Sequence, residues 1–149
     1  MLVYRILLTK YSDKLAASGR AARWNPNDVG MIYTASSRSL ACLENVVHRS
    51  QAELTLIFNI MTIDCPNSVE IKKISLDDLP HDWTDYDQMY LTQGIGARWI
   101  RENSSAILEV PSSVVDGEIN YLLNPAHADF KLINIVKNEL FVFDKRIKR

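Results

Sequence analysis

The stretch from Arg20 to His48 constrains the fold more than any other part of the chain, because a turn, a strand and a capped helix follow one another within it. Its Asn-Pro-Asn-Asp sequence favours a turn, since proline presets φ and Asn and Asp side chains bond to nearby backbone. A short apolar strand is predicted over 31–34. Ser36 and Ser37 are good N-cap residues for a helix that runs to about Arg49.

Three side chains of this stretch form the first site hypothesis. Arg23 precedes the turn, Tyr33 lies near the end of the strand, and Glu44 lies on the helix. Arginine presents a rigid fork of donors to phosphate oxygens, and tyrosine offers a flat ring with a hydroxyl. Together with a carboxylate they would suit a charged, planar, phosphorylated ligand. A structural ion pair between Arg23 and Glu44 is the alternative reading of the same residues.

The predicted helix places Glu44 at the edge of an apolar stripe made of Leu40, Leu43 and Val47. Asn45 and Arg49 fall on the opposite face. A carboxylate near the core is costly unless it is paired or serves a function.

The rest of the chain reads as strands with one more helix. Strands are predicted at 2–8, 53–62, 69–74, 106–110, 119–123, 130–136 and 140–143. The strands at 53–62 and 69–74 resemble a hairpin, and a turn at 137–139 separates the last two. A helix over 92–101 contains Gly94 and Gly96, which cost about 1 kcal/mol each relative to alanine. We expect the close approach of another backbone to be their reason. The fold class is α+β with a mixed or antiparallel sheet, paired mostly as hairpins.

Length and composition indicate one domain spanning 1–149 and an ordinary globular protein, with 47% hydrophobic and 23% charged residues. The net charge of −1 gives no broad basic field for nucleic acid or a membrane surface. No apolar run is long enough to span a bilayer. With two cysteines, one inside a predicted helix, and no signal peptide, we expect a reduced, cytoplasmic protein. The basic tail, 145–149, is either a solvated end or a docking patch.

Common catalytic motifs are absent from the sequence. The histidines at 48, 81 and 127 and the two cysteines lack metal-ligand spacing, so no metal is expected. No nucleophile elbow or Walker loop occurs, and Gly94-Ile95-Gly96 lacks the third glycine and the preceding strand of a dinucleotide fingerprint. Asn120 and His127 would ordinarily tie down loop backbone.

Several segments in order nevertheless resemble one family. They are Arg23-Trp24-Asn25-Pro26, Val29-Gly30, Tyr33-Thr34-Ala35, Ser39-Leu40-Ala41, Leu43-Glu44, His48, Gly96 to Trp99, Val110-Pro111-Ser112, and Asn120 to Pro125 with His127 and Phe130. In this order and spacing the chain resembles, over nearly its full length, the RES-domain family of bacterial toxin–antitoxin toxins. The arginine, glutamate and serine that name the family fall at Arg23, Glu44 and Ser112. Ala21 and Ala22 stand where the family usually has glycines, which makes Arg20 a second candidate for the role of Arg23.

The resemblance implies a fold similar to the ADP-ribosyltransferase toxins and an enzyme that cleaves NAD between nicotinamide and ribose. NAD would be the substrate, attacked by water or by phosphate, and no cofactor is implied. Arg23 would clamp the pyrophosphate, and Tyr33 would stack on nicotinamide or ribose. Glu44 would stabilise an oxocarbenium-like transition state. Ser112 would bind the nicotinamide or its ribose, and Asn120 is a further substrate-binding candidate.

The resemblance also implies partners. A helix-turn-helix antitoxin would block the site and would be the only link to DNA, and a homodimer within the complex is allowed. Growth inhibition would follow when the antitoxin is lost. Two alternatives stay open: an ADP-ribosyltransferase that modifies a macromolecule, and a catalytically silent binding module.

Overall fold

The computed structural model describes all 149 residues and contains one seven-stranded sheet, ordered β4-β5-β6-β2-β1-β3-β7. The strands are β1 (Leu2–Leu8), β2 (Ile32–Ala35), β3 (Phe58–Asp64), β4 (Ile71–Lys73), β5 (Ile107–Pro111), β6 (Ile119–Leu123) and β7 (Asn134–Phe141). The helices are α1 (Arg38–His48) and α2 (Met89–Glu102). Only β4 and β5 pair in parallel. The predicted α+β class with a mixed sheet is confirmed.

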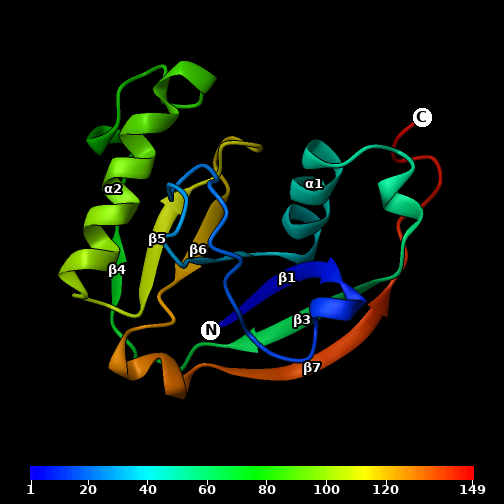
Figure 1. Cartoon of the computed structure of the whole chain (residues 1–149), viewed down its shortest axis with the longest axis horizontal. Coiled ribbons are helices and arrows are strands. Elements are labelled where there is room, and N and C mark those ends of the chain that lie inside the picture. The colour runs from blue at the N-terminus through cyan, green and yellow to red at the C-terminus, as the bar shows by residue number, and fades with distance from the viewer.

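The two helices lie over different parts of the sheet (Figure 1). α2 lies beside β4, β5 and β6, whereas α1 lies above β1 and β3. β1 joins the two regions, because Tyr4 is paired with Ala35 of β2 and with Thr62 of β3. Neither helix has the length and apolar character that a bilayer crossing requires.

The predicted hairpin of 53–62 with 69–74 is wrong. Residues Glu53–Thr55 form a single 3-10 turn, because the Glu53 carboxylate accepts from the Ser50 backbone N–H at 2.7 Å and holds the chain in a local turn. β3 therefore begins only at Phe58, and it pairs with β1 and β7. β4 lies at the opposite edge of the sheet against β5.

The predicted turn at 137–139 is also wrong. Lys137, Asn138 and Glu139 lie in the middle of β7, one continuous strand at the edge of the sheet. Polar residues are tolerated there because one edge and much of both faces meet solvent. Phe130 belongs to a preceding 3-10 helix, Ala128–Leu132, and not to the strand.

The helix after the serine cap is confirmed, but its orientation is not the predicted one. Ser37 Oγ accepts from the Leu40 backbone N–H at 3.1 Å and caps α1. The buried residues are Leu40 and Ala41, whereas Leu43 and Val47 are exposed. Asn45 decides the orientation: its amide donates to the Ile6 carbonyl of β1 at 3.2 Å and so faces the sheet.

The packing around α2 accounts for only one of the two glycines in this helix. A Cβ on Gly96 would lie 1.7 Å from the Trp24 carbonyl oxygen, whereas a Cβ on Gly94 would meet nothing within 4 Å. The expected close backbone approach is therefore real at Gly96 alone. It seats the segment that carries Arg23 directly against α2.

Candidate active site

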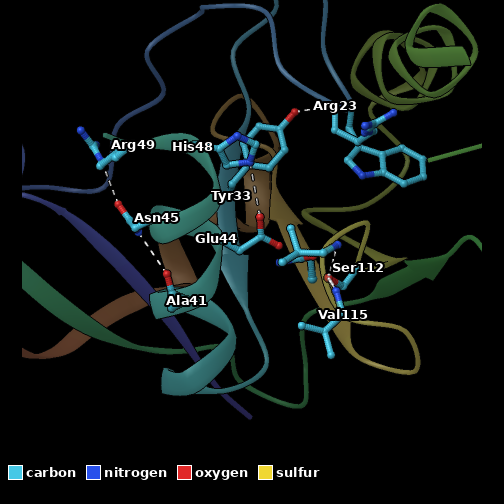
Figure 2. A network of polar contacts seen from close by, with 12 residues as sticks. Arg23, Tyr33, Ala41, Glu44, Asn45, His48, Arg49, Ser112 and Val115 are labelled. Carbon is cyan, nitrogen blue, oxygen red and sulfur yellow. Dashed lines mark hydrogen bonds and ion pairs between the residues drawn. The ribbon is translucent and has the colours of Figure 1, made fainter. Parts of the chain in front are cut away.

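A cavity of about 850 Å³ lies between α1, β2 and the segment that precedes α2. Arg23, Tyr33, Glu44 and Asn120, four of the five predicted site residues, line it. Ser112 does not, although its neighbour Ser113 does. Figure 2 shows Glu44 and His48 projecting from α1 toward Tyr33. The volume lies within the range of small-molecule sites.

Tyr33 ties the turn before it to the cavity. Its hydroxyl donates to Asn25 Oδ1 at 2.6 Å and accepts from the Trp24 backbone N–H at 3.0 Å. Asn25 in turn donates to the carbonyls of Arg20, Pro26 and Val29. Burial raises the pKa of Tyr33 well above its ordinary value. The side chain therefore stays neutral and acts by its ring and its two hydrogen bonds.

Arg23 is held through both its side chain and its backbone carbonyl. Its guanidinium donates to the Thr84 carbonyl at 2.9 Å and to the Trp83 and Asp85 carbonyls at 3.3 Å. Its own carbonyl accepts from the hydroxyl of the fully buried Thr92. These bonds fix the segment 83–85 against the cavity wall.

Glu44 has one close side-chain neighbour that can carry a positive charge, His48. Its carboxylate lies 3.7 Å from Nε2 of His48, one turn further along α1. The Glu44 side chain is 25% exposed and that of His48 is 71% exposed. Arg23 and Glu44 form no ion pair, so the structural alternative read from the sequence is not what the structure contains. The carboxylate instead faces the cavity.

The side chains of Ser112 and Asn120 both form hydrogen bonds with the backbone, Ser112 as an acceptor and Asn120 as a donor. Ser112 is buried, and its Oγ accepts from the backbone N–H groups of Val114 and Val115, both at 3.1 Å. It therefore shapes the loop between β5 and β6. Asn120 donates to the Thr34 carbonyl at 3.2 Å and keeps its amide at the cavity wall.

Three further arginines line the cavity: Arg5, Arg20 and Arg49. Sequence reasoning named only Arg20, as a second candidate beside Arg23, and missed the other two. The signal for Arg5 was a lone charge inside the apolar strand LVYRILL. Arg5 donates to the Ala16 carbonyl at 3.0 Å, and burial lowers the pKa of its guanidinium. Arg49 bonds Asn45 Oδ1 at 3.0 Å and lies over the Phe58 ring.

None of these four arginines pairs with a carboxylate. The arginines that form ion pairs are Arg38, Arg98 and Arg146, which lie away from the cavity. Four guanidinium groups without carboxylate partners give the cavity an excess of positive charge. Guanidinium groups bind anionic oxygens through charge-assisted hydrogen bonds, so an anionic ligand is the natural complement.

Comparison with known proteins shows the family to which the chain belongs. The RES domain family matches residues 2–144. A protein named Toxin Res from Photorhabdus laumondii is 38% identical, over 99% of this chain and 97% of its own length. The Prs ADP-ribosylating toxin of a Sphingobium species is 35% identical, over 95% of this chain and 91% of its own. The chain belongs to the RES-domain family.

A solved structure shows the same fold. In the MbcT–MbcA toxin–antitoxin complex of Mycobacterium tuberculosis, one chain superposes with a TM-score of 0.76. The match covers 95% of this chain and 84% of that chain at 16% identity. This likeness extends to the arrangement of the sheet and helices.

Proposed function

We propose that this chain is the toxin of a toxin–antitoxin pair and that it degrades NAD by breaking the bond between nicotinamide and ribose. The observation that carries the proposal is the charge of the cavity: four arginines without carboxylate partners, and a Glu44 carboxylate that faces the same cavity and pairs with none of them. NAD has a matching distribution of charge, with an anionic pyrophosphate and a cationic nicotinamide ring. The names of the relatives support the same class of protein.

The arginines would hold the pyrophosphate. Guanidinium groups bind phosphate oxygens through charge-assisted, often bidentate hydrogen bonds. Arg23 already donates to three carbonyls, so its contribution includes fixing the segment 83–85 as well as charge. Arg5 lies within the sheet, on a strand that pairs with β3 along its whole length and with β2 at Tyr4.

Glu44 would act on the reacting ribose. As the C–N bond breaks, its electron pair goes to the nicotinamide ring, which leaves neutral, and positive charge develops on the ribose. A carboxylate at that point stabilises the oxocarbenium-like transition state more than the ground state. No general acid is required for a leaving group that departs without protonation.

Tyr33, Asn120 and Ser112 would complete the site. The Tyr33 ring can stack on nicotinamide or ribose while its hydroxyl holds the turn before it. The Asn120 amide can accept or donate to a ribose hydroxyl. Ser112 would position the 112–115 loop, which brings Ser113 to the cavity, and this is a change from the direct contact predicted from sequence.

Two nucleophiles satisfy the chemistry. Water would give nicotinamide, ADP-ribose and a proton, whereas inorganic phosphate would give nicotinamide and phosphorylated ADP-ribose. The excess of arginine in the cavity suits phosphate as well as pyrophosphate.

A second candidate is transfer of ADP-ribose to a macromolecule, which the name of the Sphingobium relative favours. The partner expected in either case is an antitoxin, here a helix-turn-helix protein that covers the cavity. Such a toxin needs only release from its antitoxin to act.

The deciding experiment measures nicotinamide release from NAD by the purified chain, with and without phosphate, and identifies the products by mass spectrometry. Release of nicotinamide with free ADP-ribose or its phosphate would support degradation and name the nucleophile. Release only when a protein acceptor is added would favour the transferase. No release in either assay from folded, antitoxin-free protein would contradict both.

A further inference from the structure

β7 is a free edge of the sheet. Its eight residues pair with β3 on one side only, and it is last in the strand order. Figure 1 shows β7 along the lower border of the molecule, with no element beyond it. The unpaired N–H and C=O groups of such an edge can bind another strand.

Apolar side chains along this edge are exposed: Val136, Leu140 and Val142, at 57%, 72% and 87%. Leu140 shares a face of β7 with Asn138, because the two pair with Asn59 and Met61 of β3. Val136 lies at a bulge, where the pairing with β3 skips one residue, and Val142 directly follows the strand. Ile57 is 69% exposed and extends this surface, because it precedes Phe58, the residue paired with Phe141. Exposed apolar surface of this kind on an unpaired strand favours a protein partner.

We infer that β7 pairs antiparallel with β7 of a second copy of this chain, about a two-fold axis through Asn138. The sequence around Asn138 is self-complementary in that arrangement. Lys137 of each copy lies opposite Glu139 of the other, within the regular part of the strand that begins at Lys137. Opposite charges placed directly across an antiparallel pair are stabilising.

The charges also select the register. A two-fold axis perpendicular to the sheet must pass through a single residue pair, so the neighbouring registers centre on other residues of β7. Centring on Lys137 places that lysine opposite itself, and centring on Glu139 places two carboxylates opposite each other. Like charges directly across a strand pair are destabilising. Among these three registers, only the one centred on Asn138 separates the like charges.

A second copy suits the edge better than an unrelated strand. An isologous interface requires that one patch complement itself, which the Lys-Asn-Glu sequence does. Within one copy, Lys137 lies 3.3 Å from Glu139, and Arg38 lies 3.5 Å from the same glutamate. These pairs are solvent-exposed and contribute little, so they can exchange for contacts between copies. No residue of β7 lines the cavity, so this inference does not depend on the proposed function.

Charge exchange tests the pairing, with the full chain measured by sedimentation equilibrium. Lys137→Glu alone places two glutamates across from each other in each half of the interface, and Glu139→Lys alone places two lysines there. Each should weaken dimerisation at least tenfold. The double variant with both changes restores opposite charges and should restore the dimer. A sedimenting monomer for the unaltered chain, or a double variant as weak as the single ones, would overturn the inference.

Cross-linking tests the register independently of affinity. Across the axis, the two Asn138 Cα atoms would lie about 4.5–5.5 Å apart, within reach of a disulfide. Asn138→Cys in a Cys42→Ser background should therefore form a covalent dimer on oxidation. Leu140→Cys is the matched control: it lies on the same face of β7, because Asn138 and Leu140 pair with Met61 and Asn59, but its counterpart would be four residues away, about 13 Å. Equal cross-linking at both positions, or a β7 edge covered only by a different protein, would contradict the pairing.

Discussion

The Glu44 carboxylate lies 3.7 Å from Nε2 of His48, and no arginine or lysine pairs with it. The imidazole is largely exposed, so it does not seal the carboxylate from the cavity. Four arginines line the same cavity, and none of them forms an ion pair with Glu44. The positive charge of the arginines and the negative charge of Glu44 are therefore kept apart. That separation is what a ligand with an anionic centre and a cationic ring requires.

Glu44→Gln should abolish nicotinamide release while the chain stays folded. The amide keeps the shape of the side chain but removes the negative charge that stabilises the transition state, and losses of about 10²–10³ in kcat follow the removal of such a group. The measurement is the rate of nicotinamide release at saturating NAD, with the fold followed by circular dichroism.

Glu53→Gln is the matched control for this change. Glu53 also lines the cavity, but its carboxylate is already occupied by the Ser50 backbone N–H. This variant should retain activity close to that of the unaltered protein. Full activity in Glu44→Gln, or equal losses in both variants, would show that Glu44 has no specific role.

Arg23→Ala should raise the KM for NAD and loosen the segment 83–85. Loss of charge-assisted hydrogen bonds costs about 1.5–3 kcal/mol, or about 10- to 100-fold in KM. Loss of the three carbonyl contacts should also speed amide hydrogen exchange across this segment. Faster exchange with an unchanged KM would mean that Arg23 only holds the loop.

Tyr33→Phe should destabilise the fold. Removing the hydroxyl deprives the Trp24 backbone N–H of its acceptor and Asn25 Oδ1 of its donor. The expected loss is about 1–3 kcal/mol in the free energy of unfolding. Urea unfolding measures the change. Tyr11→Phe, at an exposed tyrosine, should change stability by less than about 0.5 kcal/mol. Equal effects would assign no role to the buried hydroxyl.

Local sequence signals predicted most elements. The apolar run at 2–8 is β1, and the serine cap before Arg38 begins α1. The pairing of strands was less accessible, because register and partner depend on residues distant in sequence. Nothing near β3 or β4 reveals that they lie on opposite sides of the sheet.

Site residues could be predicted where the family resemblance named them. They were harder to predict where the fold determines which side chains are buried and which reach the cavity. Leu43 and Val47 read as core by periodicity, but the bond from Asn45 to the Ile6 carbonyl turns α1 so that both are exposed. Arg5 was hidden in an apolar strand, and only the fold shows that it reaches the cavity. Ser112 was expected to contact substrate, but the structure engages its hydroxyl in the loop.

Alkaline pH should weaken the fold through Cys65. Burial raises the pKa of this thiol from an ordinary 9.0 to about 11. The unfolded chain therefore releases the proton first, and the free energy of unfolding falls as the pH rises from about 9 to 11. Cys65→Ala, compared with the unaltered protein by urea unfolding, should show a cost at pH 8 that shrinks by pH 10.5. A cost independent of pH would contradict the raised pKa.

Gly96→Ala should be destabilising although alanine favours helices. The new Cβ would collide with the Trp24 carbonyl, and overpacking of this kind costs about 1–3 kcal/mol or more. Gly94→Ala, two residues away in open space, should instead stabilise by up to about 1 kcal/mol. Because Trp24 follows Arg23, the displacement in Gly96→Ala should also raise the KM for NAD, whereas Gly94→Ala should leave it unchanged. Thermal unfolding and NAD kinetics of the two variants measure both effects, and equal stability would refute the close approach of α2 to the arginine segment.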